Sequence, residues 1–112
     1  MRYMVLVAVA ALVGGASRRA AAQTLDGRAL YQDNCKKCHG VLGRPPLMVK
    51  QQYPKVVTFD STFLAHHTED SIVTILTRGK GENMKSFKGK LTLPEMRVVA
   101  DYVRALAARP HP

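Results

Sequence analysis

The segment from Cys35 to His39 (Cys-Lys-Lys-Cys-His) holds the residues whose types and spacing could do chemistry. Two cysteines two residues apart, followed at once by histidine, form the pattern that covalent attachment of a c-type haem requires. Each thiol can form a thioether to one vinyl group of the porphyrin, and the imidazole of His39 can then reach the iron. The motif therefore predicts one haem c, with the protein supplying axial ligands, burial and electrostatics.

Three other kinds of site share part of this pattern. A thioredoxin-like redox pair is expected between a strand and a helix, whereas the segment before Cys35 is typical of a helix. A zinc site usually takes four ligands, and the chain has no cysteine besides Cys35 and Cys38. A disulfide across this spacing would be strained and would not need His39. The sequence favours haem over these alternatives.

The N-terminal segment has the features of a secretory signal. Arg2 precedes an unbroken apolar run from Val5 to Val13, and Ala20-Ala21-Ala22 offers small residues to a signal peptidase. We expect residues 1–22 to be a signal peptide and residues 23–112 to form a single cytochrome-type domain. An uncleaved N-terminal membrane anchor is the alternative, because Arg18 and Arg19 are unusual in that place. Export to the periplasm agrees with the motif, since bacteria attach haem c outside the cytoplasm.

The chain is small and basic. It has 112 residues, with 17 Lys and Arg against 8 Asp and Glu, and a formal net charge of +9. A domain of this size buries a limited core, and a covalently bound haem would supply a large apolar disc for its helices. The positive charge does not indicate nucleic-acid binding, because no recognition motif or interleaved aromatic pattern accompanies it.

The hydrophobic pattern predicts an all-α fold with three main helices packed around the haem. The first covers about 25–35, the second about 69–78, and the third begins near Thr92 and ends before Pro110. The third is the clearest, because Thr92 and Glu95 have capping-box spacing and apolar residues follow at helical intervals. The other local signals are an N-cap at Thr24 or Asp26, an N-cap at Thr68, a stop at Gly79, and an Arg97–Asp101 pair one turn apart.

The second iron ligand is the next chemical question. A methionine thioether opposite histidine favours ferrous iron and raises the potential. The domain offers three methionines: Met48, Met84 and Met96. Met96 falls on the apolar face of the third helix and Met48 follows His39 closely, so the Gly-rich loop around Met84 is favoured by spacing.

At this point the residues resemble those of a known family. The segments 26–31, 35–40, 79–87, 91–92 and 99–103 are similar to those of a small class I cytochrome c, over nearly all of the domain. The resemblance implies a cytochrome c fold in which Cys35, Cys38, His39 and Met84 bind the haem, with His39 and Met84 on the iron. It also implies that the first and last helices cross, through Gly27, Tyr31, Val99 and Tyr102.

The resemblance implies one further contact, and the sequence departs from the family at one position. The carbonyl of Pro45 or Pro46 would accept a hydrogen bond from the ring of His39 and fix its orientation. Lys85 departs from the family, whose members often have proline after the ligating methionine.

His66 and His67 precede the second helix directly, and we interpret both as surface residues or residues at its start rather than iron ligands.

Six lysines follow the same elements: Lys36, Lys37, Lys80, Lys85, Lys88 and Lys90. If these elements flank the haem edge, the lysines form a positive collar that would speed encounter with acidic redox partners. The alternative is that they only keep an exported protein soluble.

The sequence thus predicts a periplasmic electron-transfer protein with one haem, cycling between Fe(II) and Fe(III), and not an enzyme. The main alternative is a cytochrome c subunit of a larger oxidoreductase complex, including a membrane-bound one. A haem enzyme in which Met84 is displaced, and a thiol-disulfide protein without haem, are the other interpretations.

Overall fold

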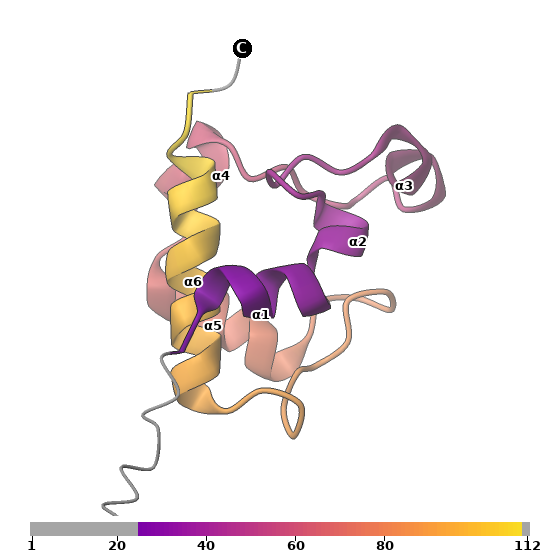
Figure 1. Cartoon of the computed structure of the whole chain (residues 1–112). Coiled ribbons are helices and arrows are strands. Elements are labelled where there is room, and N and C mark those ends of the chain that lie inside the picture. The colour runs from indigo at the N-terminus through magenta and orange to yellow at the C-terminus, as the bar shows by residue number, and fades with distance from the viewer. Residues whose placement is uncertain (1–24, 111–112) are drawn as a thin grey trace, which may run out of the picture.

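In the computed structural model, residues 25–110 are described and form six helices joined by loops, with no strand in that range (Figure 1). Three are the predicted main helices: α1 (Gly27–Asn34), α5 (Glu69–Arg78) and α6 (Leu93–Ala107). Three shorter helices were not predicted: α2 (Lys36–His39), α3 (Leu47–Gln52) and α4 (Ser61–His66). The all-α prediction is confirmed for the described part. The expected signal peptide lies outside it.

The main helices begin where local side chains satisfy their free N–H groups. The carboxylate of Asp26 accepts a hydrogen bond from the backbone of Ala29 at 3.2 Å, so α1 begins at Gly27. The hydroxyl of Thr68 caps α5, and the capping box at the start of α6 is complete. These predicted start signals are therefore confirmed, and Thr24 lies outside the described residues.

Helix α1 crosses α6 at close range, as the family resemblance implied (Figure 1). A Cβ on Gly27 would lie 2.2 Å from the backbone oxygen of Val98, so only a residue without a side chain lets the helices approach this closely. One turn later the fully buried ring of Tyr31 packs against Tyr102, with ring centroids 5.2 Å apart. This crossing fixes α1, and hence the cysteine motif that follows it, on α6.

A Gly27→Ala substitution is expected to lower the free energy of unfolding by about 1–3 kcal/mol, since the added methyl group forces the two backbones apart. Ala29→Gly, on the exposed face of the same helix, is the matched control. It should cost only about 0.5–1 kcal/mol through helix propensity. Denaturant unfolding of the haem-loaded protein measures both. A Gly27→Ala protein as stable as the wild type would contradict the close crossing.

Helix α5 packs along the other side of α6 and completes the core. Its buried residues are Ile72, Val73 and Leu76, and they meet the apolar face of α6. Arg97 of α6 forms ion pairs with Glu69 at 3.2 Å and with Asp70 at 3.3 Å. The predicted pairing of Arg97 with Asp101 is wrong, because the first turn of α5 brings two carboxylates within reach of the same guanidinium.

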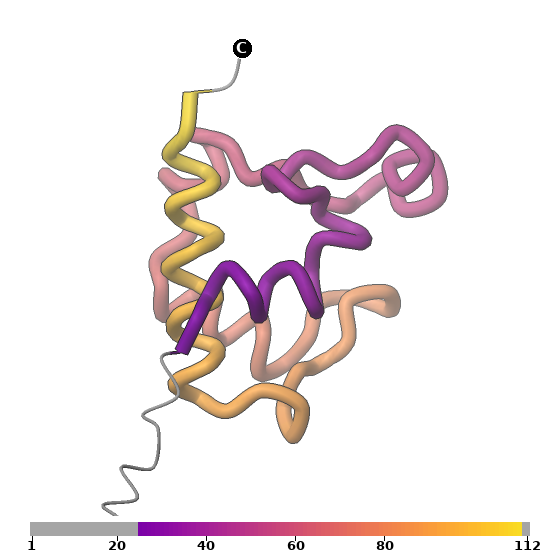
Figure 2. Tube along the Cα trace, in the orientation of Figure 1, coloured from indigo at the N-terminus to yellow at the C-terminus, as the bar shows by residue number. Residues whose placement is uncertain are grey.

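Two loops complete the fold. Residues 79–91 run from α5 to α6 and begin at Gly79, whose φ of 76° lies in the left-handed region that glycine adopts without strain. The backbone N–H of Lys80 donates to the oxygen of Met84 at 2.7 Å, which closes this loop on itself. The other loop leaves the body after α2, carries α3 at its far end and returns before α4 (Figure 2). No helix of the described part is long and apolar enough to cross a membrane.

Candidate functional site

A cavity with an almost wholly apolar wall lies between the helices. It brings together side chains from α1, α2, α4, α5, α6 and both loops, so it exists only in the folded chain. The residues that line it are Tyr31, Cys35, His39, Val57, Phe59, Phe63, His67, Ile72, Ile75, Leu76, Lys80, Met84, Val99 and Val103. Three of the four predicted haem-binding residues therefore line the same cavity: Cys35, His39 and Met84.

The short helix α2 positions the cysteine motif. The backbone N–H of His39 donates to the oxygen of Cys35 at 3.0 Å, so these two side chains lie one turn apart and both face the cavity. Cys38 is exposed and is not part of the cavity wall. Both thiols are free of any disulfide. Burial, and secondarily the neighbouring Cys38, raises the pKa of Cys35 to about 11, so its thiol is neutral at pH 7.

His39 is held by ring stacking. Its imidazole lies parallel to the ring of Phe59, with centroids 4.8 Å apart and an angle of 18° between the planes. Burial lowers the pKa of His39, while the backbone of Val57 raises it to a lesser degree. The ring is therefore neutral near pH 7, which is the form that binds metals.

The Nδ1 atom of His39 is buried and makes no hydrogen bond of regular geometry within residues 25–110. The backbone of Val57 lies near this ring and raises its pKa, but it does not form a hydrogen bond of regular geometry with the ring. The expected bond to the carbonyl of Pro45 or Pro46 is absent among the described residues, and that expectation is wrong. The physical reason is that the loop after α2 carries both prolines outward toward α3, and the returning part of the loop brings Val57 to the ring instead.

The three candidate methionines differ sharply in their surroundings. Met48 of α3 is 80% exposed, and Met96 of α6 is 4% exposed within the core. The hydroxyl of Thr77 donates to the sulfur of Met96 at 3.5 Å. Met84 is half-buried and faces the cavity from the 79–91 loop. Burial and position thus agree with the choice of Met84.

His67 is the site residue that sequence reasoning missed. Both His66 and His67 precede the start of α5, as expected, and His66 is exposed. His67 instead is half-buried in the cavity wall, with its ring stacked on Phe63 at 4.0 Å. Its Nδ1 lies 2.9 Å from the backbone oxygen of Phe63. The available signal was the helical spacing of Phe59, Phe63 and His67, which follow one another at intervals of four residues.

Tyr31 connects α1 to the end of the cysteine motif. Its hydroxyl donates to the backbone oxygen of Gly40 at 2.6 Å in the interior. Burial raises the pKa of Tyr31 far above its ordinary value, so the phenol stays protonated and keeps this bond. The residue after His39 is thereby fixed to α1, and the orientation of α2 follows from it.

Comparison with known proteins identifies the family. The family model described as cytochrome c oxidase, cbb3-type, subunit III matches residues 22–103. The chain belongs to this family of c-type cytochromes. It is a class I cytochrome c domain, and it carries covalently bound haem c, as its family does.

One curated relative and one solved structure illustrate the likeness. The cbb3-type cytochrome c oxidase subunit CcoP of Rubrivivax gelatinosus is 31% identical over 86 residues, which are 76% of this chain and 26% of CcoP. The chain thus spans about a quarter of that relative. The c-type cytochrome KustC0563 superposes with a TM-score of 0.66 at 32% identity, over 73% of this chain and 98% of that one. A point mutant of KustC0563 superposes with a TM-score of 0.64.

The cavity of this cytochrome fits a haem by its own chemistry. Its wall is apolar, as the face of a porphyrin requires. The thiol of Cys35 and the imidazole of His39 reach it from the cysteine motif, and the thioether of Met84 reaches it from the 79–91 loop. The buried Nδ1 of His39 has no regular partner among the described residues, and its pKa is lowered by burial, so the imidazole is neutral and available for ligation. The donor set therefore agrees with haem c.

Proposed function

We propose that Cys35 and Cys38 hold the haem through thioethers and that His39 and Met84 bind its iron from opposite faces. The observation that carries this proposal is the meeting of Cys35, His39 and Met84 in the wall of one apolar cavity. Cys38, exposed and one residue before His39, is within reach of the same macrocycle at its edge. The chain is an electron-transfer cytochrome c, and this ligand set supplies what that role needs.

The residues around the cavity have separable tasks. The bound haem supplies a one-electron Fe(II)/Fe(III) couple. Phe59 keeps the imidazole of His39 in one orientation by stacking on it. The soft thioether of Met84 favours the ferrous state and raises the potential. If His39 and Met84 both hold the iron, no ligand position would be left for a substrate, and we propose a carrier rather than an enzyme. The apolar wall keeps water away, so little solvent rearrangement accompanies each electron.

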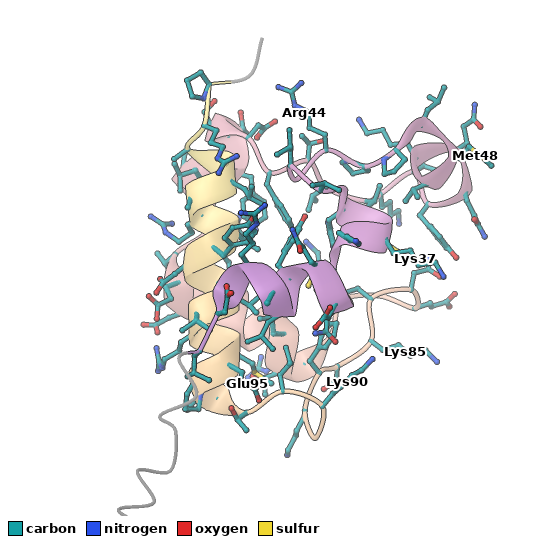
Figure 3. All side chains as sticks on the ribbon, viewed as in Figure 1. Lys37, Arg44, Met48, Lys85, Lys90 and Glu95 are labelled. Atoms are coloured by element: carbon teal, nitrogen blue, oxygen red, sulfur yellow. The ribbon has the colours of Figure 1, made fainter. Side chains whose placement is uncertain are left out.

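The lysine collar extends the proposal to partners. Lys36 and Lys37 follow Cys35 in sequence, Lys80 lines the cavity, and Lys85 follows Met84. All six collar lysines are exposed. Figure 3 shows Lys37, Lys85 and Lys90 on the same side of the molecule, where α2 and the 79–91 loop lie. A positive field at this side would attract acidic surfaces of redox proteins.

We further propose export to the periplasm, with residues 1–22 as the signal peptide. The apolar run, the small residues at 20–22 and the haem motif support this together. A free shuttle and a subunit of a membrane-bound oxidoreductase complex both fit such a domain. The second is compatible with one observation, that the relative CcoP is a subunit of a cbb3-type oxidase.

Oxidation of the reduced, haem-loaded protein by two small oxidants of opposite charge tests the carrier and the collar. Anionic ferricyanide and cationic tris(phenanthroline)cobalt(III) should each remove one electron per haem. Between ionic strengths of about 0.01 and 0.15 M, where the Debye length falls from about 30 to 8 Å, the rate with ferricyanide should fall and the rate with the cobalt complex should rise. Stopped-flow absorbance measures both rates.

Charge reversal locates the effect. Lys85→Glu should flatten the salt dependence with ferricyanide, whereas Lys50→Glu on α3, which is not one of the six collar lysines, should change it less. A protein that takes up no electron reversibly would overturn the carrier function. If the two oxidants showed the same salt dependence, or if the two charge reversals had equal effects, the proposed role of the lysine collar would be rejected and the carrier function would still stand.

A further inference from the structure

The loop that carries α3 projects from the body, and its returning end, at Val57, lines the cavity. We call residues 44–58 the finger. Its base is closed by a hydrogen bond of 2.8 Å from the backbone N–H of Phe59 to the oxygen of Gly43. The helix pairs that pack most extensively are α1/α6, α5/α6, α1/α2 and α4/α6, and α3 belongs to none of them. Figures 1 and 2 show α3 at the far end of the finger, away from the other helices.

The end of the finger is apolar and exposed to solvent. Leu47 is 72% exposed and Met48 is 80% exposed, more than the other large exposed hydrophobic residues of the described part. Figure 3 shows Met48 at the outer end of α3. Covering a leucine or methionine side chain stabilises by about 1.5–3 kcal/mol, so two such residues left in water at one tip are a considerable free-energy cost for the isolated domain.

The charge around this tip has one sign. No Asp or Glu occurs from Cys35 to Phe59, and the finger carries Arg44, Lys50 and Lys55. Lys50 and Lys55 are exposed, and Lys50 lies within α3 itself. Apolar residues that project from a surface, with cations beside them and no anion, match the interface of a bilayer that contains anionic lipids.

We propose that the finger is a membrane-surface anchor, in which Leu47 and Met48 enter the lipid headgroup region while Lys50 and Lys55 meet anionic headgroups. The shape favours a bilayer over a protein as the occupant. A stable protein interface covers about 800 Å² on each partner, and a projecting six-residue helix offers this only to a partner with a matching groove. A fluid bilayer conforms to a convex tip. The proposal does not depend on the haem ligands or on the lysine collar.

The chain contains no tryptophan, so a single introduced tryptophan reports its own surroundings. The test uses the haem-loaded Leu47→Trp protein and vesicles of phosphatidylcholine with phosphatidylglycerol. Emission should shift to shorter wavelength and be quenched by brominated lipid chains. Leu93→Trp is the matched control, because Leu93 is also exposed, at 54%, but lies at the start of α6. It should show neither effect. The haem quenches tryptophan emission in both variants, and this is corrected by comparing each variant's emission with vesicles to its own emission without them.

The charges give a second measurement. Lys50→Gln and Lys55→Gln, made in the Leu47→Trp protein, should each weaken vesicle binding about fivefold, the ratio for about 1 kcal/mol per cation at an anionic surface. Lys90→Gln, which Figure 3 places far from Met48, should change it less than about twofold, since surface attraction falls off within a Debye length.

Several results would overturn the anchor. If the emission of the tryptophan at residue 47 did not change on addition of vesicles, the membrane anchor would be ruled out and an acidic protein partner would become the better explanation of the tip. Equal quenching at residues 47 and 93 would mean that another segment, such as the N-terminal apolar run, binds the vesicles without the finger. A shift that grows with protein concentration in the absence of lipid would assign the tip to a second copy of the chain.

Discussion

Replacing Cys35 and Cys38 together with alanine is expected to leave a polypeptide with no covalently attached haem. The thioethers are the only covalent bonds between haem and chain in the proposed site, and coordination alone does not hold a haem on the chain through denaturing electrophoresis. Denaturing electrophoresis with haem staining, beside detection of the polypeptide itself, measures the loss. The wild type should stain strongly, and the double variant should fall to background.

Single variants and a ligand variant sharpen this test. Cys35→Ala or Cys38→Ala alone should keep one thioether, and the pyridine haemochrome band should move between those of haem c and haem b. Met84→Ala should retain full staining, because methionine takes no part in attachment. Covalent haem in the double variant, or haem that washes out of the wild type, would show that the cysteine motif does not attach it.

The second large effect is expected at the distal ligand. Met84→Ala should lower the midpoint potential on the order of 100 mV, within the range of roughly 0.8 V that axial ligands span. The cause is loss of the soft thioether that favours ferrous iron. The weak red absorption band of ferric methionine ligation should vanish, and the ferrous protein should gain affinity for carbon monoxide. Spectroelectrochemistry and ligand titration measure these changes.

Met96→Ala is the control for Met84→Ala, since Met96 is buried in the core between α5 and α6. It should lower the free energy of unfolding by about 2–5 kcal/mol and leave the potential and the red band close to wild type. Met48→Ala, at an exposed position, should change neither. If Met96→Ala abolished the band while Met84→Ala preserved it, the ligand assignment would move to Met96.

Local chemistry made much of the helical framework predictable. The capping box at Thr92 and the N-cap at Thr68 act over three residues, so the sequence contains all that they need. The apolar repeat of α6 also lies within one segment. Arg97 shows the limit of this reasoning, because its partner depends on which helix lies beside α6. It pairs with the two carboxylates at the start of α5 and not with Asp101 of its own helix.

The middle of the chain was harder to predict. Helices α3 and α4 each have six residues, which is too short for a periodic pattern to be distinguished from chance. The position of Val57 beside His39, and of His67 in the cavity wall, depends on how the loop returns to the body. The three methionines of the domain could be ranked only by spacing and resemblance. Their burial separates them, and the iron ligands themselves stay predictions.

The crossing of α1 with α6 has a consequence for how the protein folds. The contact joins residues near the two ends of the domain, so it closes a loop that contains most of the domain, and such closure is entropically costly and slow for a helical protein. Before it forms, Tyr31 has no partner in Tyr102, and one side of the cavity is missing. We therefore expect the cysteine motif to stay accessible to the attachment machinery during the early stages of folding. The late meeting of α1 and α6 would then close the protein around a haem that is already attached.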